Sequence, residues 1–369
     1  MLVTITITNK LVREIKSMHK YVLLIFCFLL SGCAKEQIVD RIKLMQSIGF
    51  DLQGDTFKAS GTYYAYNKQV GLSLINGEAK SFNEVLTLFT AQSDHPIAIG
   101  QLQTLVLSEK MARRGISNLA AAIIRDPLMS NNSRIVLTNE LASDILNETL
   151  KYPPSYLSDL IKQNMESGNT PNTNGHLFLD QYFGEGQDVF LPIMFRNPKG
   201  ILQMDGIGVF QNDKLMLMLP AKEGLLIKLL KDDKTNAMTS TYNFTDDDNK
   251  RISFKILNSK RNMHVKDDTV MISLKLNIEL RDYPVTSNIN TNKEDMMRLK
   301  NQYEHQLTKD IKLMLENFQK NAVDPIGFGH LTEIRQRNWS ELDFNNRQYA
   351  KLKFEVKTEI NILLLGVGH

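Results

Sequence analysis

The chain has 369 residues, of which 44 are Lys or Arg and 41 are Asp or Glu, giving a formal net charge of +3 at pH 7. Four of the basic residues and a single acidic one lie in the first 32 positions, so the rest of the chain is neutral and lacks the basic excess of a nucleic-acid-binding protein. The two cysteines are Cys27 and Cys33. A chain with so few cysteines cannot rely on a disulfide framework and must be held together by its core.

The N-terminus has the pattern of an export signal. Basic residues between Lys10 and Lys20 precede the uncharged run Tyr21 to Leu30, and Leu30-Ser31-Gly32-Cys33 follows at once. An apolar run of about ten residues is too short to span a bilayer, which needs roughly twenty, but it fits the h-region of a signal peptide. The final four residues resemble a bacterial lipobox, so we predict removal of residues 1–32 and lipidation of Cys33, whether translation starts at Met1 or Met18. The alternative is a buried cysteine in an ordinary N-terminal helix.

The first part of the remaining chain predicts a mixture of strands and helices. It begins with a hairpin that turns at Gln53-Gly54-Asp55, and strand and helix patterns then alternate up to a polar loop at 167–174. The predicted strands are 42–52, 57–66, 102–107, 134–138, 189–195, 201–210 and 214–219, and the predicted helices are 82–91, 116–124, 140–147 and 153–165. Turn residues between the last three strands indicate antiparallel pairing.

The C-terminal third has the most regular patterns. Apolar and polar residues alternate strictly from Val270 to Arg281 and again from Leu352 to Leu364, which predicts two strands with one buried face each. Between them, Thr291 and Glu294 have the spacing of a capping box. An apolar stripe follows at Met296, Leu299, Tyr303, Leu307, Ile311, Met314 and Phe318. The stripe predicts one long amphipathic helix that packs on the sheet, with a subunit interface as the alternative.

These patterns predict a multidomain α+β protein: a mixed sheet-and-helix region, then an antiparallel sheet packed against one long helix. We place the domains at 33–198 and 199–369, with a possible sub-boundary near 235. The chain has no HExxH, GxSxG, Walker or paired CxxC motif, which argues against an enzyme and against a bound metal or cofactor. Asp246-Asp247-Asp248 lacks the spacing of an EF-hand loop. No helix pattern follows Gly206-Ile207-Gly208, so we assign these glycines to a strand kink or close packing rather than to a phosphate cradle.

Five motifs carry a resemblance to a known family. They are Ile48-Gly49-Phe50-Asp51, Glu109 with Ala112-Arg113-Arg114-Gly115, Arg125-Asp126-Pro127, Gly206-Ile207-Gly208-Val209-Phe210 with Asp213-Lys214-Leu215, and Asp324-Pro325-Ile326-Gly327-Phe328-Gly329 with Trp339. In this order behind a lipobox, they resemble the Ger(x)C family, the GerAC-like C subunits of spore nutrient germinant receptors. One departure is that Ala34-Lys35 follows the cysteine where most members have Trp-Asp.

The resemblance implies a lipid-anchored, non-enzymatic subunit on the outer face of the spore inner membrane. Its implied partners are the A-type and B-type integral-membrane receptor subunits, with which it would act as scaffold or signal transducer during germination. The resemblance implies no cofactor, and it identifies no germinant-binding residue in this chain. The alternative from another class is the solute-binding lipoprotein of a transporter, although such proteins usually show two similar α/β lobes. A secreted hydrolase would need a nucleophile or metal constellation that the sequence lacks.

Overall fold

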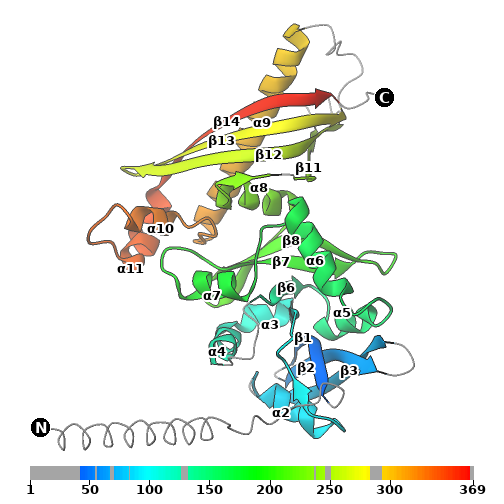
Figure 1. Ribbon diagram of the computed structural model, residues 1–369. Coiled ribbons are helices and arrows are strands. Elements are labelled where there is room, and N and C mark those ends of the chain that lie inside the picture. Colours follow the sequence, from blue (N-terminus) through cyan, green and yellow to red (C-terminus); the bar gives the residue numbers. More distant parts are fainter. Residues whose placement is uncertain are drawn as a thin grey trace, which may run out of the picture. The chain divides into compact units, whose positions relative to one another are not determined.

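The computed structural model describes residues 42–54, 56–66, 70–82, 84–125, 132–236, 238–245, 251–282 and 293–365. The strands and helices below all belong to one compact unit, Lys43–His369 (Figure 1). The predicted signal sequence, the lipobox with Cys33, and the motifs Asp126-Pro127 and Asp246-Asp247-Asp248 lie outside the described residues.

The first sheet has nine strands in the order β3-β2-β1-β5-β6-β7-β8-β9, with β4 also paired to β1. Its central pairings, from β1 through β5 and β6 to β7, are parallel, and the pairings on both flanks are antiparallel. The strands are β1 Lys43–Gln53, β2 Thr56–Tyr66, β3 Val70–Ala79, β4 Ile97–Ala98, β5 Thr104–Ser108, β6 Arg134–Thr138, β7 Phe190–Arg196, β8 Leu202–Gln211 and β9 Lys214–Leu219. The hairpin predicted from the sequence is confirmed by the antiparallel β1–β2 pair.

Helices pack on both faces of this sheet. Residues of β5 alternate between two apolar clusters, Leu105 and Leu107 entering one and Val106 the other, as expected for a central parallel strand. The first cluster also takes residues from α2 Glu84–Ala91, α3 Glu109–Arg114, α4 Ser117–Arg125 and α7 Gly175–Phe183. The second takes residues from α5 Ala142–Thr149 and α6 Tyr156–Ser167.

The second sheet has five strands in the order β10-β12-β13-β14, with β11 also paired to β12. Its strands are β10 Lys234–Thr235, β11 Thr241–Thr245, β12 Arg251–Lys266, β13 Thr269–Asp282 and β14 Lys353–Leu365. The predicted alternation holds in β13, where every second residue from Val270 to Leu280 is buried. The long helix α9 Lys293–Lys320 packs its apolar stripe into the same core, with Leu307 and Ile311 fully buried. The packing-helix prediction is therefore confirmed.

One pairing differs from the predicted antiparallel sheet, because β14 runs parallel to β13. The reason lies in the length of the connecting helix. The 28 residues of α9 span about 42 Å at 1.5 Å per residue, close to the roughly 46 Å that the 14 residues of β13 cover. The helix thus returns the chain to the start of β13, and the next strand must run in the same direction.

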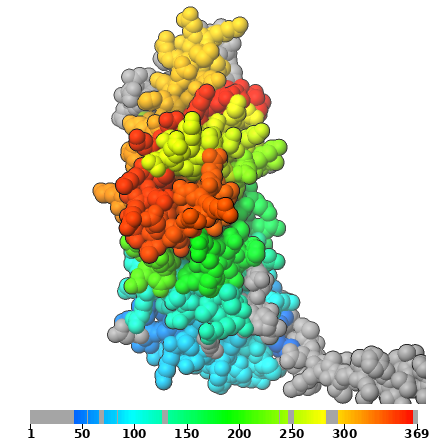
Figure 2. Space-filling view, turned by 90° about the vertical axis from the view of Figure 1, so that its left-hand side faces the viewer, coloured from blue at the N-terminus to red at the C-terminus, as the bar shows by residue number. Residues whose placement is uncertain are grey.

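Between the two sheets lies α8 Ala221–Lys231, which the sequence did not predict. Its residues from Gly224 to Leu230 are all buried, in a cluster that also contains Ile207 and Val209 of β8 and the inner face of the second sheet. Figure 2 shows the orange surface of the segment after α9 bordering the green surface of the middle of the chain. The predicted domain boundary at 198/199 stays a prediction: β7 and β8 pair within one sheet across it, and the second sheet begins at β10.

Candidate functional site

The loop after α9 is organised by one buried aspartate. Asp324 accepts backbone N–H groups from Gly327 (2.9 Å) and Gly329 (2.9 Å), one on each carboxylate oxygen. Gly327 has φ +88°, a left-handed conformation that favours glycine, and it precedes α10 Phe328–Glu333. The Asp-x-x-Gly-Phe-Gly motif is therefore a helix start held by its own first residue.

The same loop is bonded to the segment that precedes β7. The N–H of Asp188 donates to the carbonyl of Asp324 (2.9 Å), and the N–H of Asp324 donates to Oδ2 of Asp188 (2.6 Å). The N–H of His330 donates to the carbonyl of Gly186 (3.0 Å). Glu341, at the start of the short helix α11 Glu341–Asp343, accepts the N–H of Gly186 (2.8 Å). Residues 186–188 are thus fastened to the C-terminal part of the chain by four hydrogen bonds, each donated by a backbone N–H.

Two glycines allow this close approach. A Cβ on Gly186 would lie 2.4 Å from the nitrogen of His330, and one on Gly329 would lie 2.6 Å from the Cα of Gly186. Gly186 also has φ +73°. We call Gly186, Asp188, Lys231, Asp324 and Gly329 the junction. Any larger side chain at either glycine would push the two backbones apart.

Charged groups are buried in the junction. Nζ of Lys231, at the end of α8, donates to the carbonyl of Ile326 (3.3 Å) and to Oε1 of Gln187 (3.3 Å). Burial raises the pKa of Asp188 to about 7 and that of Asp324 to about 6. Burial also lowers the pKa of Lys231, although the nearby Asp324 opposes that shift. Because both carboxyl groups accept hydrogen bonds from backbone amides, the arrangement holds the chain together.

The Ile48-Gly49-Phe50-Asp51 motif docks a helix. Asp51, buried at the end of β1, accepts the N–H groups of Ala142 (2.7 Å) and Ser143 (3.0 Å) and so caps the first turn of α5. A Cβ on Gly49 would lie 2.9 Å from the Cβ of Ala142. The glycine lets α5 approach β1, and the aspartate holds its N-terminus.

Two further motifs meet each other. In α3, Arg113 pairs with Glu109 (2.7 Å) and also donates to the carbonyl of Leu215 in β9 (3.3 Å). Gly115 has φ +142°, and a Cβ there would lie 2.6 Å from Oδ2 of Asp213, in the β8–β9 turn. The motif around residues 109–115 therefore seats α3 against the motif around residues 213–215.

The remaining motif residues occupy packing positions. A Cβ on Gly206 would lie 2.2 Å from the carbonyl oxygen of Leu219, and one on Gly208 the same distance from Cδ1 of Leu137, so both are close-packing glycines. Trp339 is partly buried against the C-terminal core, with its ring 6.0 Å from that of Phe344.

The described residues contain no group of three or more His, Cys, Asp and Glu side chains that could hold a metal ion. In the same part of the chain, no helix has both the length and the apolar character needed to span a membrane. Lipidation of Cys33 stays a prediction.

The sequence alone did not reveal the partners of Asp324. Asp188 lies 136 residues from it, and the Lys231–Ile326 bond joins residues 95 positions apart. Contacts between residues so far apart in the chain leave no local pattern in the sequence. A local signal for this contact was the pair Gly184 and Gly186, because glycine permits a close approach of two backbones.

The chain matches two family models of spore germination proteins. The model "Spore germination protein N-terminal domain" matches residues 35–195, and "Spore germination B3/GerAC like, C-terminal" matches residues 205–366. The chain is 26% identical to spore germination protein GerQC of Bacillus cereus over 366 residues, covering 95% of this chain and 99% of that protein. It is 19% identical to the putative spore germination protein YfkR of Bacillus subtilis (strain 168) over 375 residues, covering 89% of this chain and 93% of that protein.

A solved structure shares the fold. The crystal structure of the GerBC protein superimposes with a TM-score of 0.55 at 18% identity, covering 86% of this chain and 96% of that one. The two family matches, taken along the chain in order, define a spore germination protein. The chain belongs to the Ger(x)C family, the GerAC-like C subunits, as the motifs predicted.

Proposed function

We propose that this protein is a lipid-anchored, non-enzymatic subunit of a spore nutrient germinant receptor. It acts as a scaffold or signal transducer beside the A-type and B-type membrane-spanning subunits, on the outer face of the spore inner membrane. The observation that carries the proposal is the match of both family models, which together extend from residue 35 to residue 366.

The roles of the motif residues support a scaffold. Asp51, Gly115 and Asp324 each hold one element against another. A protein whose motifs fix the relative position of its parts is suited to transmit a change at one surface to another. The proposal therefore assigns the chemistry of germinant recognition to no residue of this chain.

Spores provide the test. Deletion of the gene should abolish or slow germination by one nutrient class and leave germination by agents that bypass receptors normal. The tagged protein should co-purify from spore membranes with two membrane-spanning germination subunits. Equal loss of both germination routes, or co-purification with a transporter permease instead, would contradict the proposal.

The first prediction tests the lipid anchor on Cys33. Two acyl chains hold a protein on a membrane stably, whereas one gives marginal binding. Cys33→Ala should therefore leave the protein uncleaved or release it from the membrane fraction, as measured by fractionation of spore lysates. A processed Cys33→Ala protein that stays with the membrane as fully as wild type would rule out the lipid anchor.

A further inference from the structure

The second sheet has one face turned away from α9. We call it the outer face. It consists of the exposed side chains that alternate with the buried ones on the three long strands: Lys260, Asn262, His264 and Lys266 on β12, Lys275 on β13, and Lys353, Glu355 and Lys357 on β14. In the described part of the chain these side chains are open to solvent.

Positive charge accumulates on the outer face. Within the described residues, Lys260, Lys266, Lys353 and Lys357 form no ion pair with a carboxylate. Lys275 does, because its Nζ lies 2.8 Å from Glu359 on the neighbouring strand. A cluster of unpaired lysines on a protein that is close to neutral overall gives this face a local positive potential.

The arrangement of the lysines also opposes the stability of the sheet. Lys260 of β12 lies directly opposite Lys275 of β13 in the antiparallel register. Like charges placed opposite each other across two strands are destabilising. Glu359 compensates Lys275 from the other side, and Lys260 has no ion-pair partner among the described residues. A local conflict of this kind, without a structural gain, is characteristic of a functional surface.

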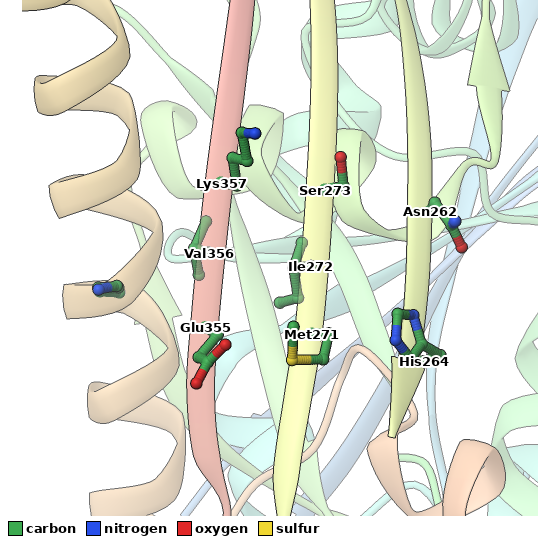
Figure 3. Close-up of a pocket in the computed structure, with 9 residues that line it drawn as sticks. Asn262, His264, Met271, Ile272, Ser273, Glu355, Val356 and Lys357 are labelled. Carbon is green, nitrogen blue, oxygen red and sulfur yellow. The ribbon is translucent and has the colours of Figure 1, made fainter. Parts of the chain in front are cut away.

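The middle of the outer face is hollowed. A pocket of about 430 Å³ lies over the three strands, and Figure 3 shows the side chains that line it. Its centre is the small Ser273, which the register places between Asn262 and Lys357. The next row along the strands is His264, Met271 and Glu355. The hollow is large enough for a side chain, and its charged lining residues are Lys357 and Glu355 of β14 and Lys312 of α9.

We propose that the outer face is a docking surface for an acidic, extracytoplasmic segment of a membrane-spanning receptor subunit. The inference rests on the function proposed above. An extended segment can place its carboxylates beside Lys260 and Lys357 and avoid Glu355, so the alternating charges set its register. A uniform anionic lipid surface would meet Glu355 and Glu359 as well as the lysines. The mixed pattern therefore favours a protein partner over lipid.

A matched pair of variants tests the sign of the interaction. Lys357→Gln and Glu355→Gln change one charge each, on the same strand and in the same hollow, with little change in volume. In spores carrying the tagged full-length protein, Lys357→Gln should reduce co-purification of the membrane-spanning subunits several-fold and make the remaining co-purification less dependent on salt, because one charge contact is lost. Glu355→Gln should leave co-purification unchanged or increase it. Lys110→Gln, at an exposed position of α3, is the remote control and should have no effect.

Each outcome has one meaning. If wild type brings down no membrane-spanning subunit, the proposed function fails, and docking fails with it. Suppose instead that wild-type protein co-purifies with the membrane-spanning subunits. Charge-specific docking alone is then overturned if Lys357→Gln and Glu355→Gln both match wild type, or if both reduce co-purification equally. Any binding of full-length Cys33→Ala protein to phosphatidylcholine vesicles containing phosphatidylglycerol should be unchanged by Lys357→Gln. Binding that Lys357→Gln abolishes would make anionic lipid the occupant and overturn the proposal. Abundance and melting temperature should stay at the wild-type level in all three Gln variants.

Discussion

Asp188 and Asp324 retain protons at a pH at which exposed aspartates are ionised. Their pKa values are raised to about 7 and about 6 by burial, whereas the unfolded chain releases the same protons near pH 3.8. Between about pH 4 and pH 7 the folded protein therefore binds more protons than the unfolded one. In that window its stability falls as the pH rises.

The second prediction follows from this fall in stability with rising pH. The melting temperature of wild type should fall between pH 5 and pH 7.5, and Asp188→Asn should flatten the fall. The asparagine keeps an oxygen for the N–H of Asp324 but has no proton to lose. The groups that act electrostatically on this pair are Lys231, Glu341 and Tyr349. Asp159→Asn, at an exposed position of α6, is the control. Parallel pH profiles for wild type and Asp188→Asn would contradict the argument.

The third prediction concerns the cap that Asp51 provides. Asp51→Ala leaves the N–H groups of Ala142 and Ser143 without their acceptor. Loss of such a cap typically costs about 0.5–2 kcal/mol in the free energy of unfolding. Urea denaturation measures it, with Asp51→Asn expected to lie between wild type and Asp51→Ala because it keeps one acceptor. A midpoint for Asp51→Ala equal to that of wild type would show that α5 docks without the cap.

At the scale of elements, the fourth prediction concerns the apolar stripe of α9. Leu307 is fully buried in the core. Leu307→Ala should reduce the free energy of unfolding by roughly 2–5 kcal/mol, because it removes buried methyl groups and leaves a cavity. Lys309→Gln, on an exposed position of the same helix, should change it by less than about 0.5 kcal/mol. Chemical denaturation of both variants checks the contrast. Similar losses would mean that charge, rather than packing, holds the helix.

Sequence patterns predicted the elements that have one solvent-exposed and one buried face. The alternation in β13 and the stripe of α9 each leave a clear period, because one side of the element is buried and the other is not. Helix α8 lacks that period, since its residues from Gly224 to Leu230 are buried on all sides. Helix α7 follows the polar loop at 167–174 and was not predicted, although the sequence contains the N-cap residue that marks its start. The side chain of Asn174 accepts the N–H of Leu177 (2.8 Å) as an N-cap.

At the scale of the whole molecule, the junction connects parts of the chain whose contact no sequence pattern indicates. The motif at Asp324 was recognisable, but its contacts with Asp188 and Lys231 depend on how β7 and α8 are placed. Only the fold brings these charges together. Family motifs therefore marked one half of the candidate site, and the three-dimensional structure supplied the other.

The fifth prediction tests the junction with two glycines of similar backbone conformation. Gly186 and Gly200 have φ +73° and +79°, so alanine at either position costs about 1 kcal/mol of backbone strain. A Cβ on Gly200 meets nothing within 4 Å, whereas one on Gly186 meets backbone atoms of Gly329 and His330 in α10. Gly186→Ala should therefore lower the melting temperature further than Gly200→Ala and expose residues 184–188 to proteases. Equal losses would mean that the close approach is dispensable.

The parallel pairing of β13 with β14 has a consequence for how the protein is made. Asn277 and Asn361, hydrogen-bonded neighbours in the finished sheet, are 84 residues apart in the chain. While the polypeptide is synthesised, β13 emerges long before the strand that will cover its edge. Contacts this distant in sequence form slowly, and an unpaired apolar strand attracts other chains in the meantime. The interval between the emergence of β13 and the arrival of β14 is therefore the stage at which this protein is most exposed to aggregation and proteolysis.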